Sequence, residues 1–185
     1  MTDSATRAVR PEDPEAARAW DLAATVADPE IPVLSVADLG VLRSARVCTT
    51  SQDGVTRRTA YIQITPTYSG CPAMDTFRAD IVAELIDGGY DDAHVEFVLA
   101  PAWTTDWMSE EGRAKLTEYG IAPPTGAAPR DRHEPGTPRP LALSVKCPHC
   151  GSLRTREQAR FASTSCKALY QCNDCLEPFD YFKVL

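Results

Sequence analysis

Apolar and polar positions alternate along the chain with two periods, one typical of helices and the other of strands. Between residues 14 and 27, Ala16, Trp20 and Ala23 fall on one side of a helix. The prolines of the following segment, residues 28–32, end that helix, because each proline disfavours helical geometry in the residue before it. The spacing therefore predicts a first amphipathic helix that begins at Pro14.

Two segments, residues 43–50 and 58–65, are predicted as strands, and in the second Ala60, Ile62 and Ile64 alternate with polar positions or tyrosine. Such alternation predicts strands with one buried face. Asp53-Gly54 lies between them and is a strong signal for a tight turn. We expect an antiparallel hairpin.

A second helix is predicted after Pro72, where Phe77, Ile81 and Leu85 recur every four residues until Gly88-Gly89. Residues 94–99 alternate again and predict a third strand. A last helix is expected after Ser109, a good N-cap residue. The order α-β-β-α-β plus a final helix predicts the α+β class, with helices on one face of a three-stranded sheet.

The remaining sequence divides the chain further. Residues 122–140 contain six prolines and no apolar periodicity, so we expect a semi-extended linker. The expected organisation is a flexible tail over residues 1–13, an α+β domain over 14–121, the linker over 122–140 and a small C-terminal domain over 141–185.

Composition and charge exclude several classes of function. The chain has 185 residues, a net charge of −7 and 43% hydrophobic residues, as in ordinary globular proteins. The negative charge argues against nucleic acid as a main partner, because binding to phosphates depends on Lys and Arg. No apolar run reaches the length of a membrane span, and the N-terminus lacks the apolar region of a signal peptide. We expect a cytoplasmic protein with no membrane partner.

The strongest chemical signal is a pair of CxxC knuckles near the C-terminus. Cys147 and Cys150 form the first, and Cys172 and Cys175 form the second after a gap of 21 residues. Four thiolates on two tight turns are the ligand set of a closed tetrahedral metal site, so we expect a metal-stabilised ribbon. Structural zinc is the favoured metal, and iron in a rubredoxin-like site uses the same ligands.

Cys71 is a separate candidate. It lies between the end of a predicted strand and the start of a helix, where first-turn N–H groups stabilise a thiolate. The alternative is a small buried core residue, since free cysteine is often buried.

Three carboxylates, Asp28, Glu30 and Asp38, flank a short apolar turn. They are candidates for a hard-metal site or for supporting thiolate chemistry, while capping of turns is the commoner use of Asp. Trp103 and Trp107, four residues apart, have two interpretations: an exposed recognition patch or a packed aromatic pair.

These residues also carry a family resemblance. Segments 28–32 (DPEIP), 38–40 (DLG) and 65–72 (TPTYSGCP) resemble the small domain of iron–sulfur assembly accessory proteins. Segments 101–108 (PAWTTDWM), 166–170 (CKALY) and 177–183 (EPFDYFK) narrow the resemblance to the PaaD family, accessory subunits of the multicomponent phenylacetyl-CoA 1,2-epoxidase. The resemblance covers nearly the whole chain outside the tail and the linker.

The resemblance implies a role in phenylacetate catabolism that is not itself catalytic. It implies that the chain assists iron or Fe–S centre assembly in the oxygenase or reductase component, with general Fe–S assembly machinery as a further partner. On this interpretation Cys71 holds iron or a cluster transiently, Asp28 and Glu30 lie near it, and the four knuckle cysteines bind the ribbon metal. The sequence has no Glu-x-x-His pair for a di-iron site and no flavin or nicotinamide fingerprint. The alternative is a stable structural or electron-transfer subunit of the epoxidase.

Overall fold

The structure, a computed structural model, describes residues 8–68, 70, 73–126 and 144–185. It contains two compact units: residues 1–103 with 107–112, and residues 104–106 with 113–185. We call them the assembly unit and the ribbon unit, and describe each by itself. Among the described helices, none has the length and apolar character needed to cross a membrane.

The assembly unit begins with helix α1 (Pro14–Thr25). The carboxylate of Asp13 accepts a hydrogen bond of 2.8 Å from the N–H of Ala16, which caps the helix, and Pro14 occupies a first-turn position where no donor is lost. Ala16 and Ala23 are buried, as the periodicity predicted, while Trp20 is only half-buried. Ala19, which the periodicity did not single out, is buried as well. Small alanine side chains let α1 approach the sheet closely.

Helix α2 (Val36–Leu39) is a single turn held by a capping box between Ser35 and Asp38. It ends at Gly40, whose φ of 69° is left-handed. A Cβ at Gly40 would lie 2.2 Å from the carbonyl oxygen of Trp107, so both the backbone conformation and the packing require glycine here.

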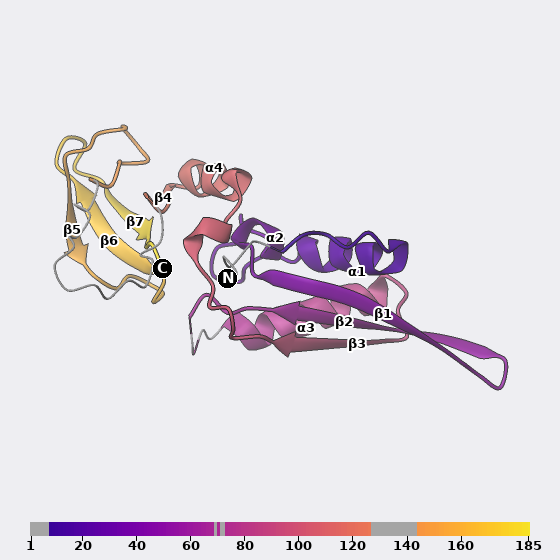
Figure 1. Ribbon diagram of the computed structural model, residues 1–185. Helices are drawn as coiled ribbons and strands as arrows, with labels where there is room; N and C mark the ends of the chain where they lie inside the picture. The colour runs from indigo at the N-terminus through magenta and orange to yellow at the C-terminus, as the bar shows by residue number, and fades with distance from the viewer. Residues whose placement is uncertain (1–7, 69, 71–72, 127–143) are drawn as a thin grey trace, which may run out of the picture. The chain divides into compact units, whose positions relative to one another are not determined.

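The predicted three-stranded sheet is present, with the strand order β1-β2-β3 (Figure 1). Strands β1 (Leu42–Gln52) and β2 (Val55–Ile64) form the antiparallel hairpin. Its turn residues have φ of 53° at Asp53 and 76° at Gly54, as a two-residue turn of the favoured hand requires. Strand β3 (Asp92–Phe97) pairs in parallel with β2.

Helix α3 (Ala73–Asp87) makes the crossover between the parallel strands. It buries Phe77, Ile81 and Leu85 as the four-residue spacing predicted. Helix α1 lies against β1, β2 and α3, and α3 lies against β3, so the two long helices share the core with the sheet (Figure 1).

The two tryptophans that follow the sheet are both buried, so the interpretation as an exposed recognition patch is wrong. Trp103 is 5% exposed and its Nε1–H donates to the carbonyl of Leu39 at 3.0 Å. Trp107 is 2% exposed, within the short helix η1 (Thr105–Trp107), and the Arg43 guanidinium lies 4.1 Å from its ring centroid. Both rings serve the fold, because burying such large apolar surfaces stabilises it.

Helix α4 (Glu110–Glu118) begins after Ser109, whose hydroxyl accepts a hydrogen bond of 2.8 Å from the N–H of Gly112. The predicted N-cap is confirmed. The Ser109 hydroxyl also donates to the Asp38 carboxylate at 3.2 Å, so the cap of one helix contacts the capping box of another.

The ribbon unit contains a sheet with the order β4-β7-β6-β5. Its strands are β4 (Ile121–Ala122), β5 (Thr155–Ala159), β6 (Lys167–Cys172) and β7 (Pro178–Phe182). The α+β class, the three-stranded sheet and the C-terminal ribbon are as expected.

The sequence predicted a ribbon over residues 141–185 without strand bounds, and strand β4 lies before that range. Ile121–Ala122 pairs in parallel with Asp180–Tyr181, although the linker was expected to begin at Ala122. Local sequence gave no signal for this strand because its partner is far along the chain. Residues 1–7 of the expected tail and 127–140 of the expected linker lie outside the described residues, and the domain boundaries stay a prediction.

Candidate functional site

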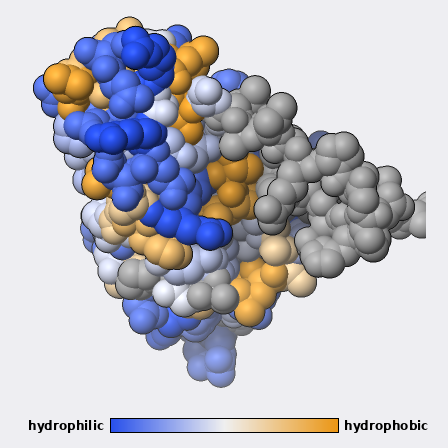
Figure 2. Space-filling view, turned by 90° about the vertical axis from the view of Figure 1, so that its left-hand side faces the viewer, coloured by the Kyte–Doolittle hydropathy of each residue, from blue (hydrophilic) through white to orange (hydrophobic). Residues whose placement is uncertain are grey.

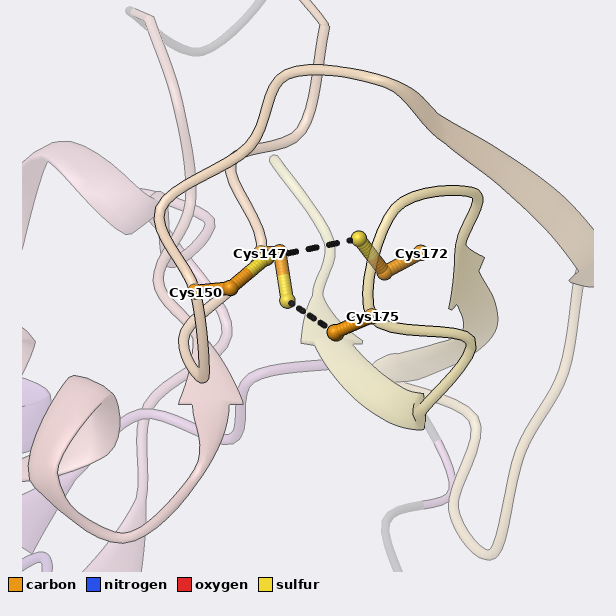
Figure 3. A group of neighbouring side chains, drawn as sticks. All are labelled: Cys147, Cys150, Cys172 and Cys175. Carbon is orange, nitrogen blue, oxygen red and sulfur yellow. Dashed lines mark hydrogen bonds between the residues drawn. The ribbon is translucent and has the colours of Figure 1, made fainter.

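The four knuckle cysteines come together in the ribbon unit. Sγ atoms of Cys147, Cys150, Cys172 and Cys175 all lie within 4.8 Å of one another. Figure 3 shows the side chains of the two turns pointing toward one another. Within the described residues this is the one group of His, Cys, Asp and Glu side chains with the geometry of a metal site.

Each knuckle is a turn built by backbone hydrogen bonds. In the first, the N–H of Gly151 donates to the carbonyl of Cys147 at 2.9 Å, and the N–H of Cys147 donates to the carbonyl of Ser152 at 2.9 Å. In the second, the N–H of Cys172 donates to the carbonyl of Glu177 at 3.0 Å. In the folded ribbon, these bonds hold the two sulfurs of each knuckle close together.

The second knuckle favours the thiolate at one of its two sulfurs, that of Cys172, while the pKa of the Cys175 thiol is raised. Backbone N–H groups of Cys175 and Asp174 face the Cys172 sulfur and lower the pKa of its thiol to about 6; the Asp174 nitrogen lies 3.4 Å from Sγ. A thiolate is the form that binds metal, so the turn prepares Cys172 as a ligand.

Side chains tie the two knuckles together at the surface. Asp174 accepts hydrogen bonds from the hydroxyl of Ser152 and, at 2.8 Å, from the guanidinium of Arg154. The N–H of Asn173 donates to the carbonyl of Arg154 at 2.7 Å. These hydrogen bonds hold the two ligand-bearing turns in a fixed orientation. Residues that surround metal ligands without binding the metal commonly have this role.

The sulfur positions fit a tetrahedral ion. A tetrahedron with metal–sulfur bonds of about 2.3 Å has edges of about 3.8 Å. Sγ of Cys147 lies 3.8 Å from that of Cys175, and Sγ of Cys150 lies 3.5 Å from that of Cys172. Four protein ligands fill such a site, so a metal held there would have no position open for substrate.

His149 and Cys166 are not part of this cluster. The His149 ring is exposed and packs edge-on against Phe179, with 6.5 Å between ring centroids. Cys166 is buried, and its sulfur lies 3.0 Å from the hydroxyl of Thr164. Neither residue is needed to complete the ligand set.

The carboxylates of the assembly unit cap turns. One oxygen of Asp28 accepts hydrogen bonds from the N–H groups of Glu30 at 2.7 Å and Ile31 at 3.0 Å. Asp38 accepts from the N–H of Ser35 at 3.0 Å. These hydrogen bonds support the capping interpretation of Asp28 and Asp38. A supporting role of Asp28, Glu30 and Asp38 toward Cys71 stays a prediction.

Cys71 lies outside the described residues. On its N-terminal side, Thr65 ends the strand region with a hydroxyl that is buried and has no hydrogen-bond partner. Such an orphaned group is uncommon, because it gives up hydration without a replacement. The sequence analysis did not single out Thr65. The only feature of the sequence that pointed to this residue was its position at the start of the TPTYSGCP segment.

A pocket of about 230 Å³ adjoins the same segment. Its lining combines residues before Cys71 with residues from the stretch after β3: Thr65, Pro66, Thr67, Tyr68, Leu99, Ala102 and Trp103. The pocket lies wholly within the assembly unit.

Comparison with known families matches both parts of the chain. Residues 17–97 match the family described as iron-sulfur cluster assembly protein, and residues 132–183 match the family described as PaaD zinc beta ribbon domain. A curated relative from Escherichia coli (strain K12), named as a subunit of 1,2-phenylacetyl-CoA epoxidase, is 41% identical over 172 residues. That alignment covers 93% of this chain and 94% of the relative.

Two solved structures resemble part of the chain. One is a domain of unknown function from Bacillus anthracis, with 23% identity, 54% of this chain and 88% of that chain covered, and a TM-score of 0.43. The other is a Mycobacterium tuberculosis protein associated with Fe–S complex assembly and repair, with 27% identity, 61% and 97% coverage, and a TM-score of 0.32.

Proposed function

Because the chain belongs to the PaaD family of phenylacetyl-CoA epoxidase subunits, we propose that it is an accessory protein of that epoxidase. It assists assembly of iron or Fe–S centres in the oxygenase or reductase component and does not catalyse the epoxidation itself. General Fe–S assembly machinery supplies the iron or cluster.

The observation that carries this proposal is the joining of two domain types in one chain. A match to an iron–sulfur assembly family spans residues 17–97 and includes Cys71, and a PaaD-type ribbon follows it. The four-cysteine cluster of the ribbon would give a metal four protein ligands, which favours a structural role over a catalytic one.

Cys71 is the proposed thiolate for the cargo. Helix α3 begins at Ala73, two residues further along the chain, and the N–H groups and positive dipole of a helix N-terminus favour thiolate over thiol. Asp28, Glu30 and Asp38 are proposed to support this site. Iron or a cluster held there is cargo for transfer, not a resident cofactor.

Zinc is the proposed ion of the ribbon, where Cys147, Cys150, Cys172 and Cys175 would hold it and it would supply structural cross-linking. An iron-loaded ribbon would absorb visible light, whereas a zinc-loaded one is colourless. Elemental analysis and the visible spectrum of the purified chain separate the two metals.

The test of the assembly role uses a strain that lacks this chain. We expect Cys71→Ser to leave expression and ribbon metal unchanged and to give no more epoxidase activity than the empty strain. Cys48→Ser is the matched control, because Cys48 is an exposed thiol of the same unit, and it should restore activity fully. Normal activity with Cys71→Ser would remove Cys71 from the proposal.

The name of the Escherichia coli relative favours a second candidate, since it describes a component of the epoxidase. In that case the chain is a stable structural or electron-transfer component of the enzyme. Stoichiometric co-purification with fully metal-loaded partners, and partner activity only in its presence, would support this candidate over the first.

A further inference from the structure

One buried polar group of the assembly unit has no partner. The hydroxyl of Thr65, the residue directly after β2, makes no hydrogen bond, and the residue is 1% exposed. Its backbone is satisfied, because the Thr65 N–H donates to the carbonyl of Val41 at 2.8 Å. Among the described residues, no other buried side-chain nitrogen or oxygen lacks a partner. An exception of this kind calls for a specific explanation, and local rules are most often broken at functional sites.

The Thr65 side chain forms part of the wall of the pocket of about 230 Å³. Pro66, Leu99 and Trp103 supply apolar surface to the same wall, and none of the described lining residues carries a charge. Enclosing a hydroxyl without a partner costs free energy. Because this hydroxyl is covered from bulk solvent, the pocket is the place from which a partner can reach it.

The pocket also lies next to the proposed cargo site along the chain. Residues 65–68 of its wall belong to the TPTYSGCP segment, and Tyr68 precedes Cys71 by three residues. Three residues of chain span at most about 11 Å. The unpartnered hydroxyl therefore belongs to the same short segment as the thiolate that is proposed to hold iron or a cluster.

The chemistry of the pocket distinguishes the two forms of cargo. A bare iron ion takes several nitrogen or oxygen ligands. The described wall has no carboxylate or imidazole, and Asp28 and Asp38 already accept backbone hydrogen bonds in their own turns. An Fe–S cluster brings its own sulfides, and proteins tune it through hydrogen bonds to sulfur and an apolar surround that limits solvent access. A neutral apolar pocket with one available O–H donor fits the cluster better.

We propose that this pocket receives an inorganic sulfide of an Fe–S cluster, and that the Thr65 hydroxyl is its hydrogen-bond donor. The inference rests on the proposed function and deepens it, because it selects a preformed cluster over bare iron as the cargo. Thr65 acts as a positioning residue, since binding of the cluster gives its hydroxyl the partner that the folded chain alone does not supply. The contact is a hydrogen bond, so it leaves the cluster free to move on to a client.

Ordered water and a side chain of a partner protein are the other occupants to be distinguished. Water would satisfy the hydroxyl in the absence of cargo, and Thr65 would then affect stability alone. A partner that inserts a side chain usually contacts apolar surface around it as well. On the face shown in Figure 2, the described hydrophobic residues lie in small separate patches among hydrophilic ones, so that face offers no broad apolar contact area.

The test measures how long the purified full chain, with zinc in the ribbon, retains a cluster. The probe is a cluster reconstituted anaerobically from ferrous iron and sulfide with dithiothreitol as the external thiol. Acid-labile sulfide and visible absorption report its loss to a ferrous chelator. We expect Thr65→Val to lose the cluster at least about tenfold faster than wild type, because a hydrogen bond to a charged acceptor is removed.

Two further variants serve as controls for this measurement. Thr65→Ser keeps the donor, so its rate of cluster loss should stay within about threefold of wild type. Thr59→Val is the same substitution at a half-buried position of β2 outside the pocket, and it should change nothing. Ferrous iron without sulfide should not be retained, and retention equal to that of the cluster would show bare iron to be the cargo.

Melting temperature separates positioning from a structural role. Thr65→Val should melt at an equal or higher temperature, because it removes an unpaired buried group. Faster cluster loss with a lower melting temperature, or without rescue by Thr65→Ser, would contradict positioning. Equal cluster retention by wild type and Thr65→Val would show that the hydroxyl binds ordered water only. Wild type that retains no more sulfide than Cys71→Ser would also overturn the inference.

Failure of this inference and failure of the proposed function give different results in cells. Iron and acid-labile sulfide are measured in the oxygenase and reductase components from cells that carry Thr65→Val or Cys71→Ser, and we expect poor loading with both. Full loading with Thr65→Val and poor loading with Cys71→Ser would mean that the pocket is not a cluster subsite while assembly through Cys71 stands. Full loading with both variants would remove Cys71 from the proposal as well.

Discussion

The two units of the chain differ in what fills their interiors. In the assembly unit most of the fully buried side chains are aliphatic, with Trp107 added to them. The aliphatic ones include Leu34, Val36, Leu39, Ile62, Ile64, Ile81 and Leu85. In the ribbon unit the buried cluster has seven members, Ala122, Val145, Cys147, Ala168, Cys172, Phe179 and Tyr181, and two of them are knuckle cysteines. One interior is held by apolar burial, and the other is built around the metal site.

Because their interiors differ, the assembly unit and the ribbon unit should depend on different interactions for their stability. A small unit with few aliphatic side chains in its core needs a metal or another cross-link to fold. A unit with a continuous aliphatic core does not. Perturbations of the metal and perturbations of core packing should therefore act on different parts of the chain.

The largest effect should follow metal removal. A strong chelator should unfold the ribbon unit, because structural zinc in small domains supplies roughly 10 kcal/mol of apparent binding free energy. Hydrogen exchange read segment by segment should show lost protection in β5, β6 and β7 and retained protection in β1, β2 and α3. Equal loss of protection in both groups of elements would show that the assembly unit also depends on the metal.

Substitution of Gly40 should destabilise the assembly unit and leave the ribbon unit intact, the opposite of metal removal. Gly40→Ala forces a Cβ against the Trp107 carbonyl oxygen, 2.2 Å away, at a left-handed φ, so we expect the assembly unit to lose about 3 kcal/mol or more. Ribbon metal content should not change. Gly54→Ala is the control: its φ is also positive but no atom lies within 4 Å of the added Cβ, so the cost should be only about 1 kcal/mol.

Asp174→Ala should weaken the ribbon without abolishing it. The substitution removes the contacts to Ser152 and Arg154 that join the knuckles, and loss of such supporting groups lowers metal affinity by about tenfold. Competition with a chromophoric chelator measures this. Unchanged affinity would mean that the backbone turns alone orient the sulfurs.

The smallest effect should be a gain in stability. Thr65→Val removes a buried hydroxyl that has no partner, so we expect the assembly unit to gain about 1 kcal/mol in its free energy of unfolding. Thr105→Val in the ribbon unit is the contrasting change. Thr105 is equally buried but its hydroxyl lies 3.4 Å from the carbonyl of Leu185, so this substitution should not stabilise. If both substitutions raised the free energy of unfolding, the missing hydrogen bond of Thr65 would not explain the gain.

Sequence patterns predicted the parts of the fold that depend on local chemistry. Asp53-Gly54 marked the hairpin turn because few residues adopt its backbone conformation. The spacing of Phe77, Ile81 and Leu85 marked the buried side of α3. The paired CxxC turns marked the metal cluster, since two tight turns leave four sulfurs few other arrangements.

What the sequence did not reveal depends on partners distant along the chain. The four-residue spacing of Trp103 and Trp107 favoured packing but left an exposed patch open. Both are buried, with contacts to Leu39 and Arg43. Strand β4 forms only because Asp180 and Tyr181 lie beside it. The positive φ of Leu176 had no signal at all, because leucine is not a residue that predicts it.

The central claim is that this chain assembles metal centres in the epoxidase. Its most direct test is iron and acid-labile sulfide in the oxygenase and reductase components, each purified from cells with the chain, without it, and with Cys71→Ser. The account predicts metal-poor partner in the last two and full loading in the first. Fully loaded partners in all three, active once the purified chain is added, would contradict assembly and make the chain a working subunit.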